Sequence, residues 1–192
     1  MPIVGQFGSL AGFGVFPGGA LESIATVTVG SGGASSLTFS DIPSGFQHLQ
    51  VRVIARDGLN ATTSAMQLRL NGSSTNADYF THRLYGDGST ATADHVTGLS
   101  GSGGILLSRI AGSTATANIF GAIILDILDY SVTTKNKTIR SFGGADANGS
   151  GLVHVESGLF LQTSAITQVR LAPFSGNFAQ HTTAALYGVK AP

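Results

Sequence analysis

The chain has 192 residues, of which 42% are hydrophobic and only 10% are charged, and its ten basic and ten acidic residues give a formal net charge of zero. This length suffices for one domain with a core of its own. The lack of a basic stripe argues against a nucleic-acid-binding protein, and the lack of cysteine excludes disulfides and cysteine-based zinc sites. A neutral, charge-poor surface does little to resist association, which suits a subunit of an assembly.

Residues 1–20 predict an N-terminal attachment arm. Six of the first nineteen residues are glycine, which resists helix and strand because ordering it costs the most backbone entropy. Large apolar side chains lie between these glycines and favour burial against another surface. We therefore expect partner contacts at Phe7, Leu10, Phe13 and Phe16. No basic region precedes this stretch, so it does not resemble a secretory signal.

The next segments predict strands separated by polar turns. Residues 22–30 and 36–40 are expected to form a hairpin across the turn SGGAS. Residues 47–56 give the clearest strand, with Leu49, Val51, Val53 and Ala55 on one face and polar residues on the other, Ile54 being the exception. Residues 66–72 repeat this alternation.

Residues 79–89 show a further short alternation, and residues 89–104 are expected to be a long loop of small residues. Residues 105–112 fit either a strand or a single helical turn. Residues 118–130 are apolar on both faces, which predicts a central strand covered on both sides, with Gly121 where another backbone comes close. Four more strands are expected at 137–146, 152–162, 165–173 and 184–190.

Roughly ten short strands without alternating helices predict an all-β fold, an antiparallel β-sandwich of jelly-roll type. We expect a single domain over residues 21–192 after the arm. Its predicted core comprises Leu49, Val51, Val53, Leu68, Leu70, Ile123, Leu125, Ile127, Val169 and Leu171. The longest apolar run is too short to span a bilayer and contains Asp126, so no membrane insertion is expected.

Candidate chemical groups are few and scattered. His154 and Glu156 share one strand face and would suit a metal or an acid–base pair, but no third ligand is evident and an exposed polar face is the favoured interpretation. Asp126 and Asp129 are expected to point to opposite faces, which disfavours a glycosidase pair. Residues 146–151 resemble the start of a calcium loop but lack its final Glu, so a turn is favoured. No catalytic residue, cofactor or metal is therefore assigned.

Three of the ten basic residues fall in the segment TTKNKTIR at 133–140. Lys135, Lys137 and Arg140 would suit an acidic glycan or a phosphate. An exposed turn whose charges are solvated is the favoured interpretation.

Three segments carry a resemblance to a known family: IPSGFQHLQVRVIAR at 42–56, DYSVTTKNKT at 129–138 and SGNFAQHTTAALYGVK at 175–190. Over about residues 22–190 the chain resembles a domain of tailed-bacteriophage virion proteins, of the minor structural, tail or fibre type. The resemblance implies a non-enzymatic structural component of the virion and brings no catalytic motif with it.

On that resemblance we expect a tail-tip or short-fibre module that docks other virion subunits through its arm. A homo-oligomer, with a trimer favoured, and contact with a host-surface glycan are further expectations. A capsid decoration protein is the alternative within the class, and a carbohydrate-binding module is the alternative outside it, although the chain has no Trp and only four Tyr.

Overall fold

A computed structural model describes residues 20–98 and 103–190 of the chain. These residues contain twelve β-strands and one short 3-10 segment, Asn76–Asp78. Every pairing between named strands is antiparallel. The expected all-β, antiparallel fold is thus confirmed. The arm residues Phe7, Leu10, Phe13 and Phe16 lie outside the described part.

Eight strands form the larger sheet, in the order β1-β12-β3-β8-β9-β10-β5-β6. The sequence of each strand alternates between side chains that face the core and side chains that face away from it, as in β3, where Leu49, Val51 and Val53 are buried. The strands are β1 (Leu21–Thr28), β12 (Thr183–Val189), β3 (His48–Ala55), β8 (Gly121–Leu128), β9 (Lys137–Asp146), β10 (Gly151–Phe160), β5 (Tyr79–Gly86) and β6 (Ala91–Thr97).

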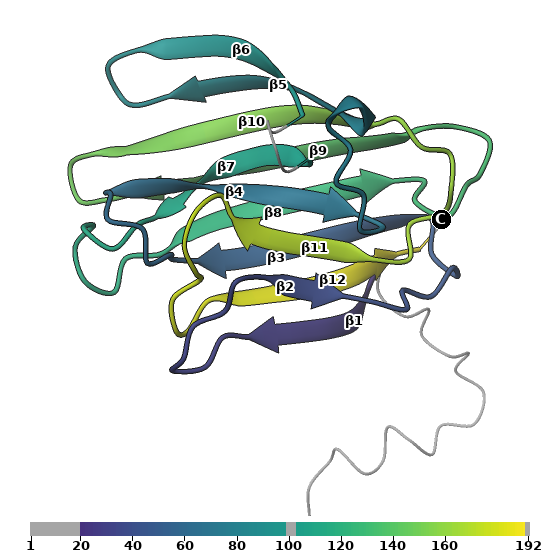
Figure 1. Cartoon of the computed structure of the whole chain (residues 1–192), viewed down its shortest axis with the longest axis horizontal. Helices are drawn as coiled ribbons and strands as arrows, with labels where there is room; N and C mark the ends of the chain where they lie inside the picture. The colour runs from purple at the N-terminus through teal and green to yellow at the C-terminus, as the bar shows by residue number, and fades with distance from the viewer. Residues whose placement is uncertain (1–19, 99–102, 191–192) are drawn as a thin grey trace, which may run out of the picture.

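Four strands form the smaller sheet, in the order β2-β11-β4-β7. They are β2 (Leu37–Phe39), β11 (Val169–Pro173), β4 (Thr63–Leu70) and β7 (Ile105–Ala111). This sheet lies in front of the larger one, as a second layer, in Figure 1. Strand β7 packs against β8, β9, β10 and β5, so the smaller sheet covers one face of the larger.

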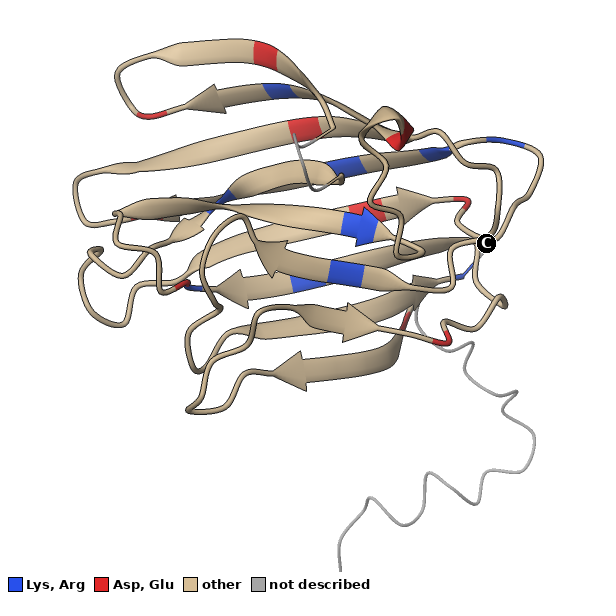
Figure 2. Ribbon diagram, in the orientation of Figure 1, with Lys and Arg blue, Asp and Glu red and all other residues tan. Residues whose placement is uncertain are grey.

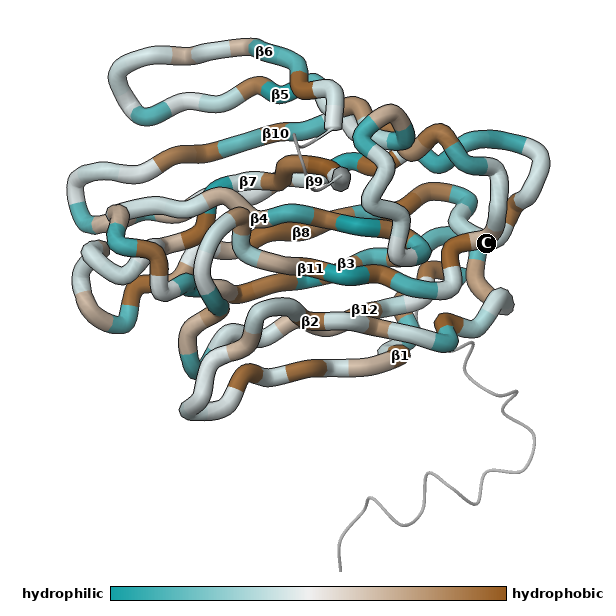
Figure 3. Tube along the Cα trace, viewed as in Figure 1, coloured by the Kyte–Doolittle hydropathy of each residue, from teal (hydrophilic) through white to brown (hydrophobic). Residues whose placement is uncertain are grey.

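One main core fills the space between the sheets and takes side chains from both. Every residue of the predicted core is buried. In Figure 3 brown hydrophobic positions alternate with teal and white ones along the strands, as that arrangement requires. Burial of the larger side chains stabilises the fold by about 1.5–3 kcal/mol each, which makes this core the main source of stability.

The expected hairpin of residues 22–30 and 36–40 is wrong. Strand β1 pairs with β12 in the larger sheet, whereas β2 pairs with β11 in the smaller one. The glycine-rich connection therefore crosses from one layer to the other, and Ala34 within it bridges to Phe178. A short polar turn between two alternating segments carries no signal that distinguishes a hairpin from such a crossover.

One further expectation about strands is wrong, and one open alternative is resolved. The loop expected at 89–104 contains β6, which pairs with β5 from Phe80–Thr97 to Gly86–Ala91. Residues 105–112, left open between strand and helical turn, form strand β7.

Strand β8 is central, as expected, but the described residues do not cover it on both sides. Its residues Ile123 and Leu125 are buried, whereas Ala122 and Ile124 are exposed on the opposite face. The close approach expected at Gly121 is confirmed, because a Cβ there would lie 2.8 Å from Ile110 Cα. Among the described residues there is no helix that is long and apolar enough to cross a membrane.

Candidate partner-binding surface

The face of the larger sheet that points away from the core carries large apolar side chains. Six of them, hereafter the apolar band, are exposed by 45–58% of their surface: Ile54, Leu84, Ile124, Phe142, Val153 and Val155. They come from the adjacent strands β3, β8, β9, β10 and β5. A single exposed apolar residue is ordinary, but a contiguous group of this kind is typical of an interaction surface.

Strand register aligns four residues of the band into one ridge. Ile124 is opposite Phe142, Phe142 is opposite Val155, and Val155 is opposite Leu84. Side chains opposite each other on the same face lie within about 4.5–5.5 Å at their Cβ atoms. The ridge therefore crosses four strands without a polar interruption, and Arg52 on β3 stands at its end, opposite Ile124.

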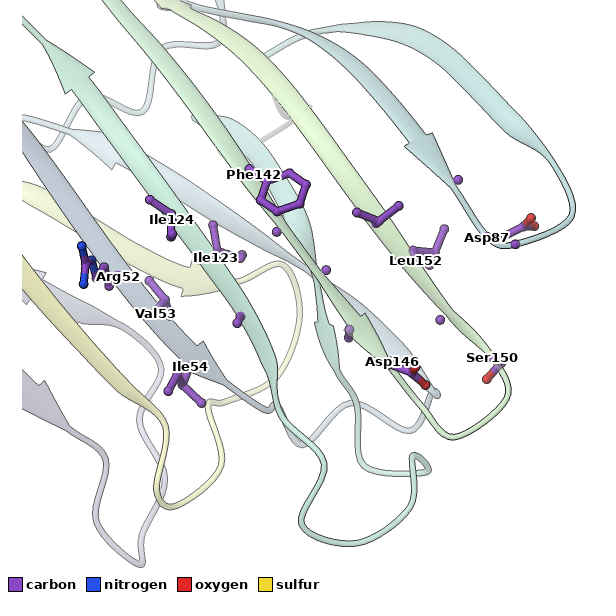
Figure 4. A pocket seen from close by; sticks show the side chains of 18 of the residues that line it. Arg52, Val53, Ile54, Asp87, Ile123, Ile124, Phe142, Asp146, Ser150 and Leu152 are labelled. Carbon is purple, nitrogen blue, oxygen red and sulfur yellow. The ribbon is translucent and has the colours of Figure 1, made fainter.

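A furrow runs beside this ridge, two residues further along each strand. Here Ala122 is opposite Gly144, Gly144 is opposite Val153, and Val153 is opposite Gly86. Small residues in the middle of this row leave an open groove of about 770 Å³. Figure 4 shows the groove with Ile54, Ile124 and Phe142 along it.

The groove depends on glycine at Gly144. A Cβ at that position would overlap the carbonyl oxygen of Leu152 on the neighbouring strand. A side chain there would push β9 and β10 apart and would also fill the furrow. A glycine inside a strand often marks close approach of another backbone, and here it also keeps the groove open.

Hydrogen-bonded polar side chains border the band on its other side. Asp126 accepts a hydrogen bond from Gln50 Nε2 at 3.0 Å and one from Arg140 Nε at 2.9 Å. Arg52 Nε donates to Gln50 Oε1 at 3.0 Å, and its guanidinium lies 5.4 Å from the centre of the Tyr187 ring. We call these five residues the polar row; three of them, Arg52, Asp126 and Arg140, are charged, and Figure 2 shows that charged positions are few on the sheet.

The ends of the groove carry opposite charges. Arg52 lines one end, and Asp87 and Asp146 line the other, at the turns β5–β6 and β9–β10. Hydrogen bonds to Asp87 from the backbone N–H groups of Thr90 and Ser89 lower the pKa of that carboxyl below its usual value. Asp146 accepts a bond from Asn148 N at 2.9 Å, which confirms a turn at 146–151.

His154 and Glu156 are brought together, but they are not on an exposed face as expected. Both are buried between the sheets, and His154 Nδ1 lies 3.3 Å from Glu156 Oε1. Ser141 donates a hydrogen bond to the other Glu156 oxygen, and Tyr85 stacks on the His154 ring at 4.9 Å. Both side chains are thus buried from solvent.

The expected exposed basic turn is also wrong for Lys137, which is fully buried. Its ammonium group donates to the carbonyl oxygens of Lys135 at 3.0 Å and Thr163 at 2.8 Å, and to that of Val132. Burial lowers the pKa of Lys137. Lys135 pairs instead with Asp129, and Arg140 with Asp126, so the three cations do not form one anion site. Asp126 and Asp129 are thus structural partners of basic residues.

The apolar band was missed by reasoning from the sequence, although two signals for it exist. Ile54 breaks the polar face of its strand, and residues 118–130 are apolar on both faces. Both signals indicate burial, but they do not say whether the covering surface belongs to the same chain. The two-layer arrangement of the described residues shows that the smaller sheet lies on the other face and leaves the band exposed.

Comparison of the chain with protein-family models, with curated proteins and with solved structures gave no match. Within residues 20–98 and 103–190, no three His, Asp or Glu side chains are grouped so that they could hold a metal ion. The apolar band and its groove are accordingly the candidate functional site.

Proposed function

We propose that the chain is a non-enzymatic structural subunit of a tailed-phage virion, a tail-tip or short-fibre module. Its work is to hold subunits together, through the apolar band and through the arm residues Phe7, Leu10, Phe13 and Phe16. The observation that carries this proposal is the band itself. An apolar surface that spans five adjacent strands of a free protein invites non-specific association, whereas in an assembly it is covered.

The strand order supports a jelly roll with two insertions. Strands β1-β12-β3-β8 and β2-β11-β4-β7 form two four-stranded layers, and the chain passes between them as in the eight-stranded jelly roll found in viral capsid and lectin domains. The hairpins β5–β6 and β9–β10 are then insertions that widen one layer. This fold is shared by proteins of many functions, so it supports the proposal only as an analogy.

The expected homo-oligomer, with a trimer favoured, is part of the proposal, and the exposed apolar band supports self-association. The chain carries no net charge that would oppose contact between copies. Light scattering of the purified chain should give a mass of several chains. A monomer at high protein concentration would contradict this part of the proposal.

Two alternatives from the sequence are distinguishable by position and by ligand. A capsid decoration protein would use the same band against capsid subunits, and electron microscopy of the particle separates capsid from tail. A carbohydrate-binding module would use the groove for a host-surface glycan. The groove offers Phe142 as an exposed ring and the carboxylates of Asp87 and Asp146, but its floor is apolar, which favours a protein partner.

The proposal is tested by quantitative mass spectrometry of purified particles of the virus that encodes the chain. We expect the chain at several copies per particle, retained through a density gradient and a high-salt wash. Salt should not release it, because burial of apolar surface is insensitive to the screening of charges. Absence from purified particles would overturn the proposed function.

A further inference from the structure

We propose that the apolar band and its groove bind the N-terminal segment, residues 1–19, of a second copy of this chain. The inference rests on the proposed function, since it names the partner of the same surface. In this arrangement the N-terminal segment of each copy contacts the band of the next copy, so the same contact repeats through the assembly. Three observations carry the inference: composition, spacing and path.

The segment and the groove match in composition. Residues 1–19 contain no charged side chain, and their large apolar residues are separated mainly by Gly, Ser and Ala. The groove is likewise apolar along its length, with charges only at its ends, on Arg52, Asp87 and Asp146. An uncharged segment can cover such a floor without burying an unpaired charge, which would be costly.

The apolar residues of the segment recur with a period of three. Phe7, Leu10, Phe13 and Phe16 are each three residues apart, so in an extended polyproline II conformation they point to one side, about 9.3 Å apart at a rise of 3.1 Å per residue. Two strand spacings measure about 9.6 Å. A segment that lies across the strands therefore places one of these four residues, hereafter the anchors, at every second strand.

The length of the band fits this spacing. From β3 to β5 there are four strand spacings, or about 19 Å. Three successive anchors in polyproline II span six residues, also about 19 Å. Three of the four anchors thus fit the band at once, which matters because a single apolar contact does not compensate for the entropy lost on ordering a glycine-rich segment.

Path favours a second copy over the same chain. The described chain begins beside Leu21, which pairs with Val189 at the end of the sheet opposite to the groove. From there Ile124 is about 20 Å away across three strands, whereas five residues extend at most about 17 Å, so Phe16 of the same chain falls short of the band and only its Phe7, Leu10 and Phe13 are within reach. The direct path also crosses the polar row, whose charged groups would lose water.

The test exploits the lack of cysteine in the full-length chain. One variant carries Ser9→Cys in the segment and another carries Ala122→Cys in the exposed furrow. Mixed under mild oxidation, they should form a disulfide-linked heterodimer. The control partner is Thr38→Cys, exposed on β2 of the smaller sheet, which should link to Ser9→Cys at least tenfold more slowly.

A matched pair of substitutions tests the band itself. Phe142 is 58% exposed and lies on the band, whereas Phe174 is 56% exposed and lies off it. Sedimentation equilibrium should show that Phe142→Glu weakens self-association at least tenfold, which corresponds to about 1.4 kcal/mol. Phe174→Glu should leave it within twofold, and both variants should keep the parent circular dichroism spectrum.

Three results would overturn the inference. If the double variant Ser9→Cys/Ala122→Cys closes within one chain at high dilution and the mixture gives no heterodimer, the segment binds its own chain. If Phe142→Glu weakens association but the mixture gives no heterodimer, the bands of two copies pack face to face. If neither variant has an effect, the band binds a different protein. Each of these results leaves the particle test of the proposed function untouched, and failure of that test leaves a positive cross-link standing.

Discussion

At the scale of single residues, the side chain of Lys137 holds two loops in place. Its ammonium group is fully buried and donates to three backbone carbonyls, of Val132, Lys135 and Thr163. These carbonyls belong to the segments that follow β8 and β10. One cation thus donates to three backbone acceptors from two segments.

Replacing Lys137 by Met keeps most of the volume and removes all three donors. We expect a loss of about 2–4 kcal/mol in the free energy of unfolding, because three hydrogen bonds to a charged group are lost and such bonds are worth more than neutral ones. Urea denaturation measures it. Lys135→Met, whose side chain is 57% exposed, is the control and should cost under about 1 kcal/mol. Equal stability of the two variants would show that the three bonds contribute little.

At the scale of elements, the β5–β6 hairpin forms the end of the larger sheet and is held by an ion pair across it. Arg83 and Asp94 are directly opposite in the register, and Arg83 Nε donates to Asp94 Oδ1 at 2.7 Å while Nη2 binds the second oxygen. This hydrogen bonding lowers the pKa of Asp94 below its ordinary 3.8. The paired carboxylate therefore favours the folded state when it is ionised.

The sign of the pH effect follows from that direction. Because the folded-state pKa is the lower one, the stabilisation is present above about pH 4 and is lost as the pH falls through the folded-state pKa. Asp94→Asn should lower the free energy of unfolding by about 0.2–1 kcal/mol at pH 7, since Asp94 is partly exposed, and by less at pH 2.5. Thermal melts at both pH values measure it. An equal loss at both would show that the charge is not the cause.

The strands that could be predicted from the sequence bury large apolar side chains, whereas the strand that was missed does not. Strand β3 was predicted because its large apolar residues stand at every second position and alternation reports burial directly, and β8 was predicted because a run of apolar residues also indicates a buried strand. Strand β6 was missed because its inward positions are Thr92, Asp94 and Val96, and none of its residues is fully buried. It forms as the partner of β5, through pairing that no local pattern encodes.

The apolar band could not be predicted for the same reason, because it depends on how distant strands pair. Exposed apolar residues on β3, β8, β9, β10 and β5 become one band only through the register of pairs distant in sequence. His154 and Glu156 were correctly placed on one face, but which face points to the core depends on the second layer. The two-residue period of a strand shows which side chains share a face, but it does not show which face points to the core.

At the scale of the whole molecule, the central proposal is that a partner covers the outer face of the larger sheet in an assembled particle. The smaller sheet covers the inner face. Among the described residues, the apolar band on the outer face stays exposed.

Hydroxyl-radical footprinting of intact particles tests that claim most directly, with the dilute free chain as the reference. Phe142 and Phe174 are exposed to nearly the same extent in the free chain, at 58% and 56%, so they should be labelled alike there. In particles the labelling of Phe142 should fall several-fold, while that of Phe174 stays within about twofold of the free chain. Labelling of Phe142 that is unchanged in particles would contradict the account.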